Sequence, residues 1–222
     1  GLFSLAMGMT VVIPDMDPTK VALADPEVLV EAIQQHQISN AFASPALWRP
    51  FVRWCLQNQV KLPSLRRVLS AGAPIPPQIH QAFQQVVCEG VEVHTPYGAT
   101  ESLPVASIGS LEVLGETQEL TNQGYGTCVG SIAPNMTVRI IQIRDDAIAD
   151  WSEELCVADG EIGEVCVRGP VVTTEYKEDP EKTREAKIYN ADGSLWHRMG
   201  DLGYFDKQGR LWFCGRKSHR VT

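Results

Sequence analysis

The pattern of apolar and polar positions changes about halfway along the chain. Over residues 1–110, short runs of β-branched and apolar residues alternate with stretches in which apolar residues recur every three to four positions. The short runs predict buried strands, and the longer stretches predict amphipathic helices. Alternation of this kind is typical of parallel βαβ units with right-handed crossovers.

Local start signals mark the expected helices. Asp25 and Pro26 supply an N-cap and a proline at the first helical position, Ser44 and Pro45 repeat the pattern, and Pro77 opens a third helix. The strands expected between them cover residues 10–13, 41–43, 67–70 and 91–94. The apolar face at residues 47–55, together with Leu103 and Val105, is either plain core or the wall of an acyl pocket.

The second half has a different pattern. Residues 111–125 are polar and contain glycine, which predicts a loop, whereas residues 138–143 and 164–168 alternate as half-buried strands do. Only residues 179–187 have a helical pattern there. We therefore expect an α/β fold in which a parallel-sheet half, 1–110, is followed by a small, mostly antiparallel β-barrel or sandwich, 111–216, and by the start of a hinge, 217–222.

Charge limits the classes of partner. The chain has 27 acidic and 19 basic residues and a formal net charge of −8. Such a field repels a phosphate backbone or an anionic membrane, which excludes a protein that coats nucleic acid. An anionic ligand would need local donors, such as backbone N–H groups, a few basic side chains or a metal ion.

Cysteine spacing and the two ends of the chain indicate context. The six cysteines lack the spacing of a zinc or redox motif, which predicts free buried thiols in a reducing cytoplasm. No run approaches the roughly 18 apolar residues of a transmembrane helix. The chain begins without Met or a basic leader and stops soon after an expected strand, so we expect it to be a fragment of a larger protein.

Candidate chemistry follows the strands of the first half, because ligands in open parallel sheets lie beyond the carboxyl ends of the strands. Ala71, Gly72 and Ala73 are small residues that would let a flat ring approach the backbone, or they form an ordinary tight turn. Residues 95–101 offer an aromatic ring, a glycine, a hydroxyl and a carboxylate, a set suited to a base, a phosphate and Mg²⁺. The alternative is a surface turn.

Two later segments extend this set. Residues 198–203 place the Asp201 carboxylate beside glycines, where it could accept hydrogen bonds from a ribose diol or simply form a Gly-Asp turn. Residues 215–221 form a basic segment that is either functional or a solvated charge run. Taken separately, each segment has an ordinary structural explanation.

Taken together and in this order, the segments resemble the adenylate-forming superfamily of acyl-CoA synthetases, peptide-synthetase adenylation domains and firefly-type luciferases. Residues 97–101, Tyr-Gly-Ala-Thr-Glu, match the aromatic-Gly-x-Thr-Glu motif. Residues 198–201, Arg-Met-Gly-Asp, match Arg-Thr-Gly-Asp except at Met199, and Gly215-Arg216 opens the hinge motif. The sequences of residues 44–48, 95–105 and 196–201 resemble those of the branch that contains fatty-acid ligases and olefin-pathway β-lactone synthetases.

The resemblance implies a role for each matching residue. Thr100 would meet the α-phosphate and Glu101 would bind Mg²⁺, which makes these two the implied catalytic residues. Asp201 would hold the ribose hydroxyls, and Arg216 would reach ribose or phosphate. The implied cofactor-binding set is Ala71, Gly72, Ala73, Tyr97, Gly98, Thr100, Asp201 and Arg216, with ATP and Mg²⁺ as cofactors; Ala71, Gly72, Ala73 and Tyr97 would flank adenine.

The implied reaction is activation of a carboxylic acid, such as a fatty or 3-hydroxy fatty acid, to acyl-AMP with release of pyrophosphate. CoA, a carrier thiol or an internal hydroxyl that closes a β-lactone are the implied acceptors. The family's phosphate loop and its C-terminal lid with the catalytic lysine are absent from these residues, and Ser218 stands where the hinge has Asp or Lys. The fragment alone is therefore expected to be inactive. A nucleotide-binding module without turnover and an amino-acid-activating domain are the alternatives.

Overall fold

The computed structural model describes residues 2–220, and the chain divides after His94 into two compact units. We describe each unit by itself. Gly1, Val221 and Thr222 lie outside the described residues, so the last two positions of the expected hinge are among them. The boundary expected at residue 110 was drawn from the change in sequence pattern, and it stays a prediction.

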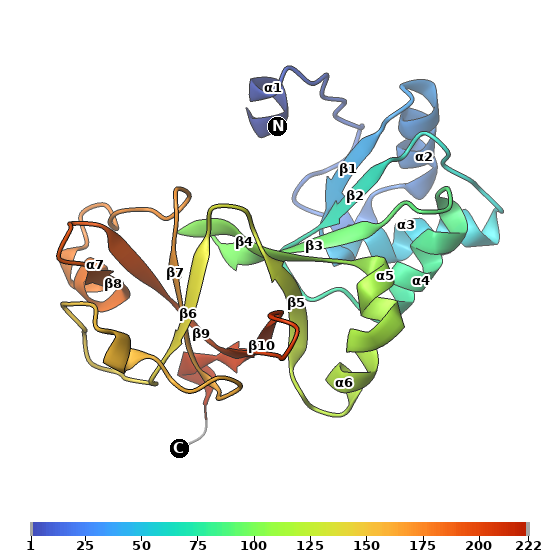
Figure 1. The fold of residues 1–222 in the computed structure, drawn as a ribbon. Helices are drawn as coiled ribbons and strands as arrows, with labels where there is room; N and C mark the ends of the chain where they lie inside the picture. The colour runs from blue at the N-terminus through green and yellow to red at the C-terminus, as the bar shows by residue number, and fades with distance from the viewer. Residues whose placement is uncertain (1, 221–222) are drawn as a thin grey trace. The chain divides into compact units, whose positions relative to one another are not determined.

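The first unit has the expected α/β arrangement. Strand β1 (Asn40–Ala43) pairs in parallel with β2 (Arg67–Ser70), and β2 pairs in parallel with the beginning of β3 (Val93–Ala99). Helix α2 (Pro26–Gln35) precedes β1 in sequence, α3 (Pro45–Gln57) connects β1 to β2, and α4 (Pro77–Val86) connects β2 to β3; the three helices lie beside these strands in space (Figure 1). The predicted helices and their proline starts are confirmed.

Helix starts and aromatic packing explain this arrangement. The Asp25 side chain accepts a hydrogen bond from the Glu27 backbone N–H at 2.9 Å, as an N-cap should. The apolar faces of α3 and α4 meet through an edge-on contact of Trp48 with Phe83, and Trp48 also lies edge-on to Phe51 within α3. The face of α3 at residues 47–55 is thus part of the unit's core, as the plainer alternative held.

The first residues of the chain differ from expectation. The structure has a short helix α1 (Leu2–Ala6) and a 3₁₀ turn η1 (Val21–Leu23), but residues 10–13 form no strand. Ile13 is 86% exposed. A β-branched run becomes a strand only when a neighbouring strand pairs with it, and the pattern alone does not supply that neighbour.

The second unit is mostly antiparallel, as predicted. Its strands follow the order β4-β5-β10-β9-β7-β6, with β8 paired to β9. Figure 1 shows β6, β7 and β9 side by side in this unit. The strands are β4 (Ser102–Gly109), β5 (Thr127–Ile132), β6 (Thr137–Ile141), β7 (Gly163–Arg168), β8 (Lys187–Tyr189), β9 (Leu195–Phe205) and β10 (Leu211–Arg216).

The loop expected at residues 111–125 is wrong, because most of this segment is helical. It forms α5 (Ser110–Glu112), a π-helical turn η2 (Val113–Thr117) and α6 (Gln118–Asn122). Val113 and Leu120 pack against a small core that contains Trp212. The remaining helices are η3 (Glu153–Leu155), α7 (Pro180–Ala186) and η4 (Lys217–His219).

All six cysteines are free, as predicted, but they are not all buried. Cys55, Cys128 and Cys166 are buried, whereas Cys88 and Cys214 are exposed. Within residues 2–220, no helix has the length and apolar character that a membrane crossing needs.

Candidate functional site

The motif at residues 97–101 lies on a hairpin. Strand β3 continues through Ala99, Thr100 and Glu101 form the turn, and β4 begins at Ser102. The predicted loop is therefore mainly strand. A Cβ atom at Gly98 would lie 2.4 Å from the Ser102 carbonyl oxygen, so only glycine fits this close approach.

Three residues of the expected site converge in the second unit. The Tyr97 hydroxyl donates to Asp201 Oδ2 at 2.6 Å, and Arg216 Nη1 donates to Asp201 Oδ1 at 2.7 Å. Asp201 and Arg216 are register partners on β9 and β10. The Asp201 side chain is only 6% exposed, whereas that of Arg216 is 53% exposed. A buried carboxylate is thus oriented by two donors, one of them at the surface.

Tyr97 and Arg216 are in the protonation states that donation to Asp201 requires. Burial raises the pKa of the Tyr97 hydroxyl, and the negative charge of Asp201 raises it further. The hydrogen bond to Asp201 raises the pKa of the Arg216 guanidinium. At neutral pH Tyr97 therefore keeps its proton and Arg216 its charge. Each carboxylate oxygen of Asp201 still has a second lone pair with which to accept a bond from a ligand hydroxyl.

Arg198, which begins the second matching motif, has a structural role. Its Nη2 lies 2.7 Å from Glu164 Oε2, and both side chains are almost fully buried. Lys217 Nζ also contacts Glu164, at 3.0 Å. Gly200 adopts a positive φ of 65°, which suits the irregular register between β9 and β7 at this point. The motif thus directs Arg198 toward Glu164 and Asp201 toward Tyr97.

Glu101 is held by a segment that sequence reasoning missed. The Tyr176 hydroxyl donates to Glu101 Oε1 at 2.8 Å, and the Thr173 backbone N–H donates to the Glu101 carbonyl oxygen at 2.8 Å. Partial burial raises the pKa of the Glu101 carboxyl, but the bond from Tyr176, its own backbone and the nearby His197 and Lys182 lower it more, so the net shift is downward. Glu101 is therefore an anion at neutral pH.

Two buried basic side chains lie behind this pair. Lys187 on β8 and His197 on β9 are register partners, and they are 1% and 2% exposed. Burial and the neighbouring Lys187 lower the pKa of His197 to about 4, so its imidazole is neutral at pH 7. Burial also lowers the pKa of Lys187. Nothing in the spacing of Tyr176, Lys187 or His197 marks them in the sequence, because their proximity to Glu101 depends on the sheet.

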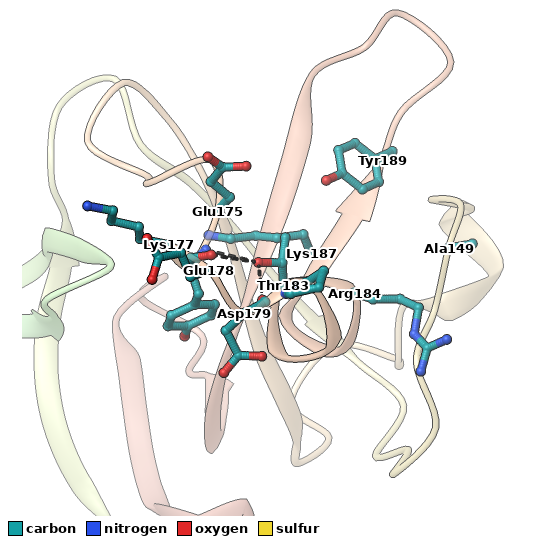
Figure 2. Close-up of a pocket in the computed structure, with 11 residues that line it drawn as sticks. Ala149, Glu175, Lys177, Glu178, Asp179, Thr183, Arg184, Lys187 and Tyr189 are labelled. Atoms are coloured by element: carbon teal, nitrogen blue, oxygen red, sulfur yellow. Dashed lines mark hydrogen bonds between the residues drawn. The ribbon is translucent and has the colours of Figure 1, made fainter.

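Two hollows in the described part of this unit are lined by these residues. One, of about 630 Å³, lies between residues 175–180 and the α7–β8 segment, and Figure 2 shows Lys187 among the residues that line it. The other, of about 210 Å³, lies beside Arg216 and is lined by Met199, Gly200, Arg216, Lys217 and Ser218. Tyr176 lines the larger hollow and contacts Glu101, whereas Arg216 links the smaller hollow to Asp201.

The carboxylate of Glu101 suits a metal ion that is bound jointly by the protein and by substrate phosphates. Within residues 2–220, no group of three or more His, Cys, Asp or Glu side chains could cage a metal ion. Magnesium is commonly bound by one or two carboxylates plus substrate phosphates. Glu101, an anion at a turn beside the exposed Thr100, fits that requirement.

The first unit holds the remaining residues of the expected set. Ala71, Gly72 and Ala73 directly follow β2, as predicted, and Gly72 has a positive φ of 92°. The Ala71 N–H donates to the Ala43 carbonyl oxygen at 3.3 Å. The loop is thus anchored at one end and turns at a position that favours glycine.

Comparison with known proteins assigns the chain to a family. A model of the family described as "AMP-binding enzyme" matches residues 2–177. The chain belongs to this family of adenylate-forming proteins.

Individual relatives refine the comparison. The chain is 49% identical to an olefin beta-lactone synthetase of Stenotrophomonas maltophilia and 47% identical to one of Xanthomonas campestris, over 99% of its own length in each case. It spans 40% and 39% of the length of these relatives.

Solved structures share the fold of this chain. CmiS6 superimposes with a TM-score of 0.75 at 27% identity, over 96% of this chain and 48% of that one. An O-succinylbenzoate coenzyme A synthetase of Bacillus subtilis in complex with AMP gives a TM-score of 0.70 at 21% identity, over 99% of this chain and 38% of that chain. At that identity the second likeness concerns the fold alone.

Proposed function

We propose that the protein containing this chain is an ATP-dependent synthetase that activates a 3-hydroxy fatty acid as its acyl-adenylate and closes it to a β-lactone. The observation that carries the proposal is the convergence of Tyr97, Asp201 and Arg216, with Glu101 at the turn of the Tyr97 hairpin. The similarity to two olefin beta-lactone synthetases over nearly the whole chain supports the choice of product.

In this proposal the residues bind ATP and align it with the acid, and they form no covalent bond with the substrate. Asp201, oriented by Tyr97 and Arg216, accepts the ribose hydroxyls of ATP. Thr100, exposed at the hairpin turn, donates to the α-phosphate, and Glu101 holds the Mg²⁺ that neutralises phosphate charge. Alignment and charge stabilisation are the main catalytic effects in transfers to phosphorus.

Two steps complete the proposed reaction. A carboxylate oxygen of the acid attacks the α-phosphorus of ATP, and pyrophosphate leaves with the bonding electrons. The 3-hydroxyl oxygen then attacks the acyl carbon, loses its proton to solvent, and AMP leaves as the four-membered ring closes. Transfer to CoA or to a carrier thiol would replace only the second step.

The test uses the full-length protein that contains this chain. It is supplied with MgATP and matched fatty and 3-hydroxy fatty acids, with and without CoA, and the products are identified by mass spectrometry. We expect β-lactone and AMP only from 3-hydroxy acids. Acyl-CoA from both kinds of acid would indicate a CoA ligase, amino-acid adenylation would indicate a peptide-synthetase activity, and ATP binding without AMP release would indicate a nucleotide-binding module.

A further inference from the structure

Lys187 is a buried cation for which the proposed reaction has no role. Its side chain is 1% exposed, and its Nζ donates to the Thr173 carbonyl oxygen at 2.5 Å and to Thr173 Oγ1 at 3.4 Å. Both acceptors are neutral. Burial lowers the pKa of Lys187, and the negative charge of the nearby Glu101 opposes that shift. Burial of an ammonium group in such surroundings is unfavourable, and an apolar side chain would fill the same space more cheaply.

Thr173, the hydrogen-bond partner of Lys187, also contacts Glu101. The Thr173 N–H donates to the Glu101 carbonyl oxygen, and Tyr176, three residues later, donates to the Glu101 carboxylate, each at 2.8 Å. Residues 173–176 therefore hold both the backbone and the side chain of Glu101. Lys187 fixes this segment at Thr173, and its Nζ lies 6.0 Å from the centre of the Tyr176 ring.

Strand pairing makes Lys187 a rigid support. It lies on β8 opposite His197 of β9, and His197 Nδ1 is buried without a hydrogen-bond partner among the described residues. From β8, the Lys187 side chain extends to Thr173. Thr173 belongs to residues 173–176, which lie outside any strand or helix. A charge held by a strand is a more precise anchor for such a segment than the segment's own contacts.

We propose that Lys187 is a positioning residue, which anchors residues 173–176 so that Tyr176 and Thr173 aim the Glu101 carboxylate at the Mg²⁺ of MgATP. The inference rests on the proposed function. Lys187 itself touches neither the nucleotide nor the metal. Residues that orient a metal ligand affect metal affinity strongly even though they do not bind the ion.

The test measures the Mg²⁺ dependence of ATP binding by calorimetry in the full-length protein. Lys187→Met removes the charge and the donors but keeps the length of the side chain. We expect the half-saturating Mg²⁺ concentration to rise by about tenfold, the usual size of such an effect, with ATP affinity at saturating Mg²⁺ retained. Lys187→Arg should restore part of the loss, and Lys207→Met, at an exposed lysine, should change nothing.

Amide hydrogen exchange supplies a readout that is independent of activity. In Lys187→Met the Thr173 amide, which bonds to Glu101, should exchange faster, while amides in β9 keep their protection. Tyr176→Phe removes only the hydroxyl that contacts Glu101, so it tests the same chain of contacts if Lys187→Met does not fold. The two changes should be non-additive in their effect on Mg²⁺ dependence, because they act through one carboxylate.

The outcomes separate the two proposals. An unchanged Mg²⁺ dependence in Lys187→Met and in Tyr176→Phe, with MgATP still bound, would overturn the positioning role and leave the proposed function intact. Absence of any Mg²⁺-dependent ATP binding by the unaltered protein would overturn both. A loss of thermal stability alone, with no change in Mg²⁺ dependence, would make Lys187 a structural residue only.

Discussion

At the scale of single residues, Asp201 has two kinds of contact: hydrogen bonds within the protein and, in the proposed function, hydrogen bonds to the ribose of ATP. Tyr97 and Arg216 occupy one lone pair on each of its oxygens, and the proposed ribose hydroxyls would occupy the others. Any change at this position therefore alters contacts within the protein as well as contacts to the nucleotide. The two effects can be separated only by a variant that removes one of them.

Asp201→Ala should raise the Michaelis constant for ATP at least about tenfold in the full-length enzyme, because each unpaired ribose hydroxyl costs about 1–3 kcal/mol. Tyr97→Phe removes the same internal hydrogen bond but keeps the carboxylate, so it should lower thermal stability with a smaller effect on ATP. Asp159→Ala, at an exposed turn, is the surface control. An unchanged Michaelis constant in Asp201→Ala would make Asp201 a structural residue.

Glu101→Gln tests the proposed metal ligand. The amide oxygen can still accept the bond from Tyr176, so the free energy of unfolding should stay within about 0.5 kcal/mol of that of the unaltered protein. The lost charge should slow pyrophosphate exchange, and a higher Mg²⁺ concentration should restore part of the rate. Glu89→Gln, at an exposed position in the first unit, is the surface control. Full activity at low Mg²⁺ would place the metal on another residue.

At the scale of elements, local signals predicted helices better than strands. Asp25-Pro26 begins α2 because the cap and the fixed φ of proline act within a few residues. Residues 10–13 carried an equally good strand pattern and form none, since a strand depends on a distant partner. The short helices at 110–122 were missed because Gly115 and their polar residues obscure the period, although Val113 and Leu120 pack on Trp212.

The candidate site was likewise predicted only in part from the sequence. The motif residues Tyr97, Glu101 and Asp201 were recognisable in the sequence, because their types and order resemble a known family. Their contacts were not, since Tyr97 and Asp201 are 104 positions apart and meet only through strand pairing. Tyr176 and Lys187 carry no local signal, so the support of Glu101 emerged from the structure alone.

Helix α4 contains a histidine that should make the first unit sensitive to acid. His80 is 1% exposed, and burial lowers its pKa to about 4 from an ordinary value of 6.5. The unfolded chain therefore binds a proton between these pH values that the folded unit does not. Stability should be complete above the unfolded pKa and should fall as the pH drops toward about 4.

The measurement is urea unfolding of the chain at several pH values between about 7 and about 4.5. His80→Leu should remove up to about 1.4 kcal/mol per pH unit from the slope of the unfolding free energy, the largest contribution one proton can make. His36→Leu, at an exposed histidine after α2, tests whether loss of any imidazole has this effect. Equal slopes in His80→Leu and the unaltered chain would contradict the prediction.

At the scale of the whole molecule, charge bears on what these 222 residues can do by themselves. The net charge is −8, and Arg216, the cation beside Asp201, is already paired with it at 2.7 Å. Transfer to an α-phosphate requires cationic groups that neutralise the triphosphate. The proposed site would thus orient a nucleotide better than it balances the nucleotide's negative charge.

We therefore expect the 222-residue chain alone to give no pyrophosphate exchange with any acid, whereas the full-length protein should be active. The chain spans only 40% of the length of its relative from Stenotrophomonas maltophilia. The assay follows labelled pyrophosphate into ATP at saturating acid and Mg²⁺, with circular dichroism to show that the chain is folded. Exchange well above a buffer blank, abolished by Asp201→Ala, would show that these residues contain a complete adenylation site.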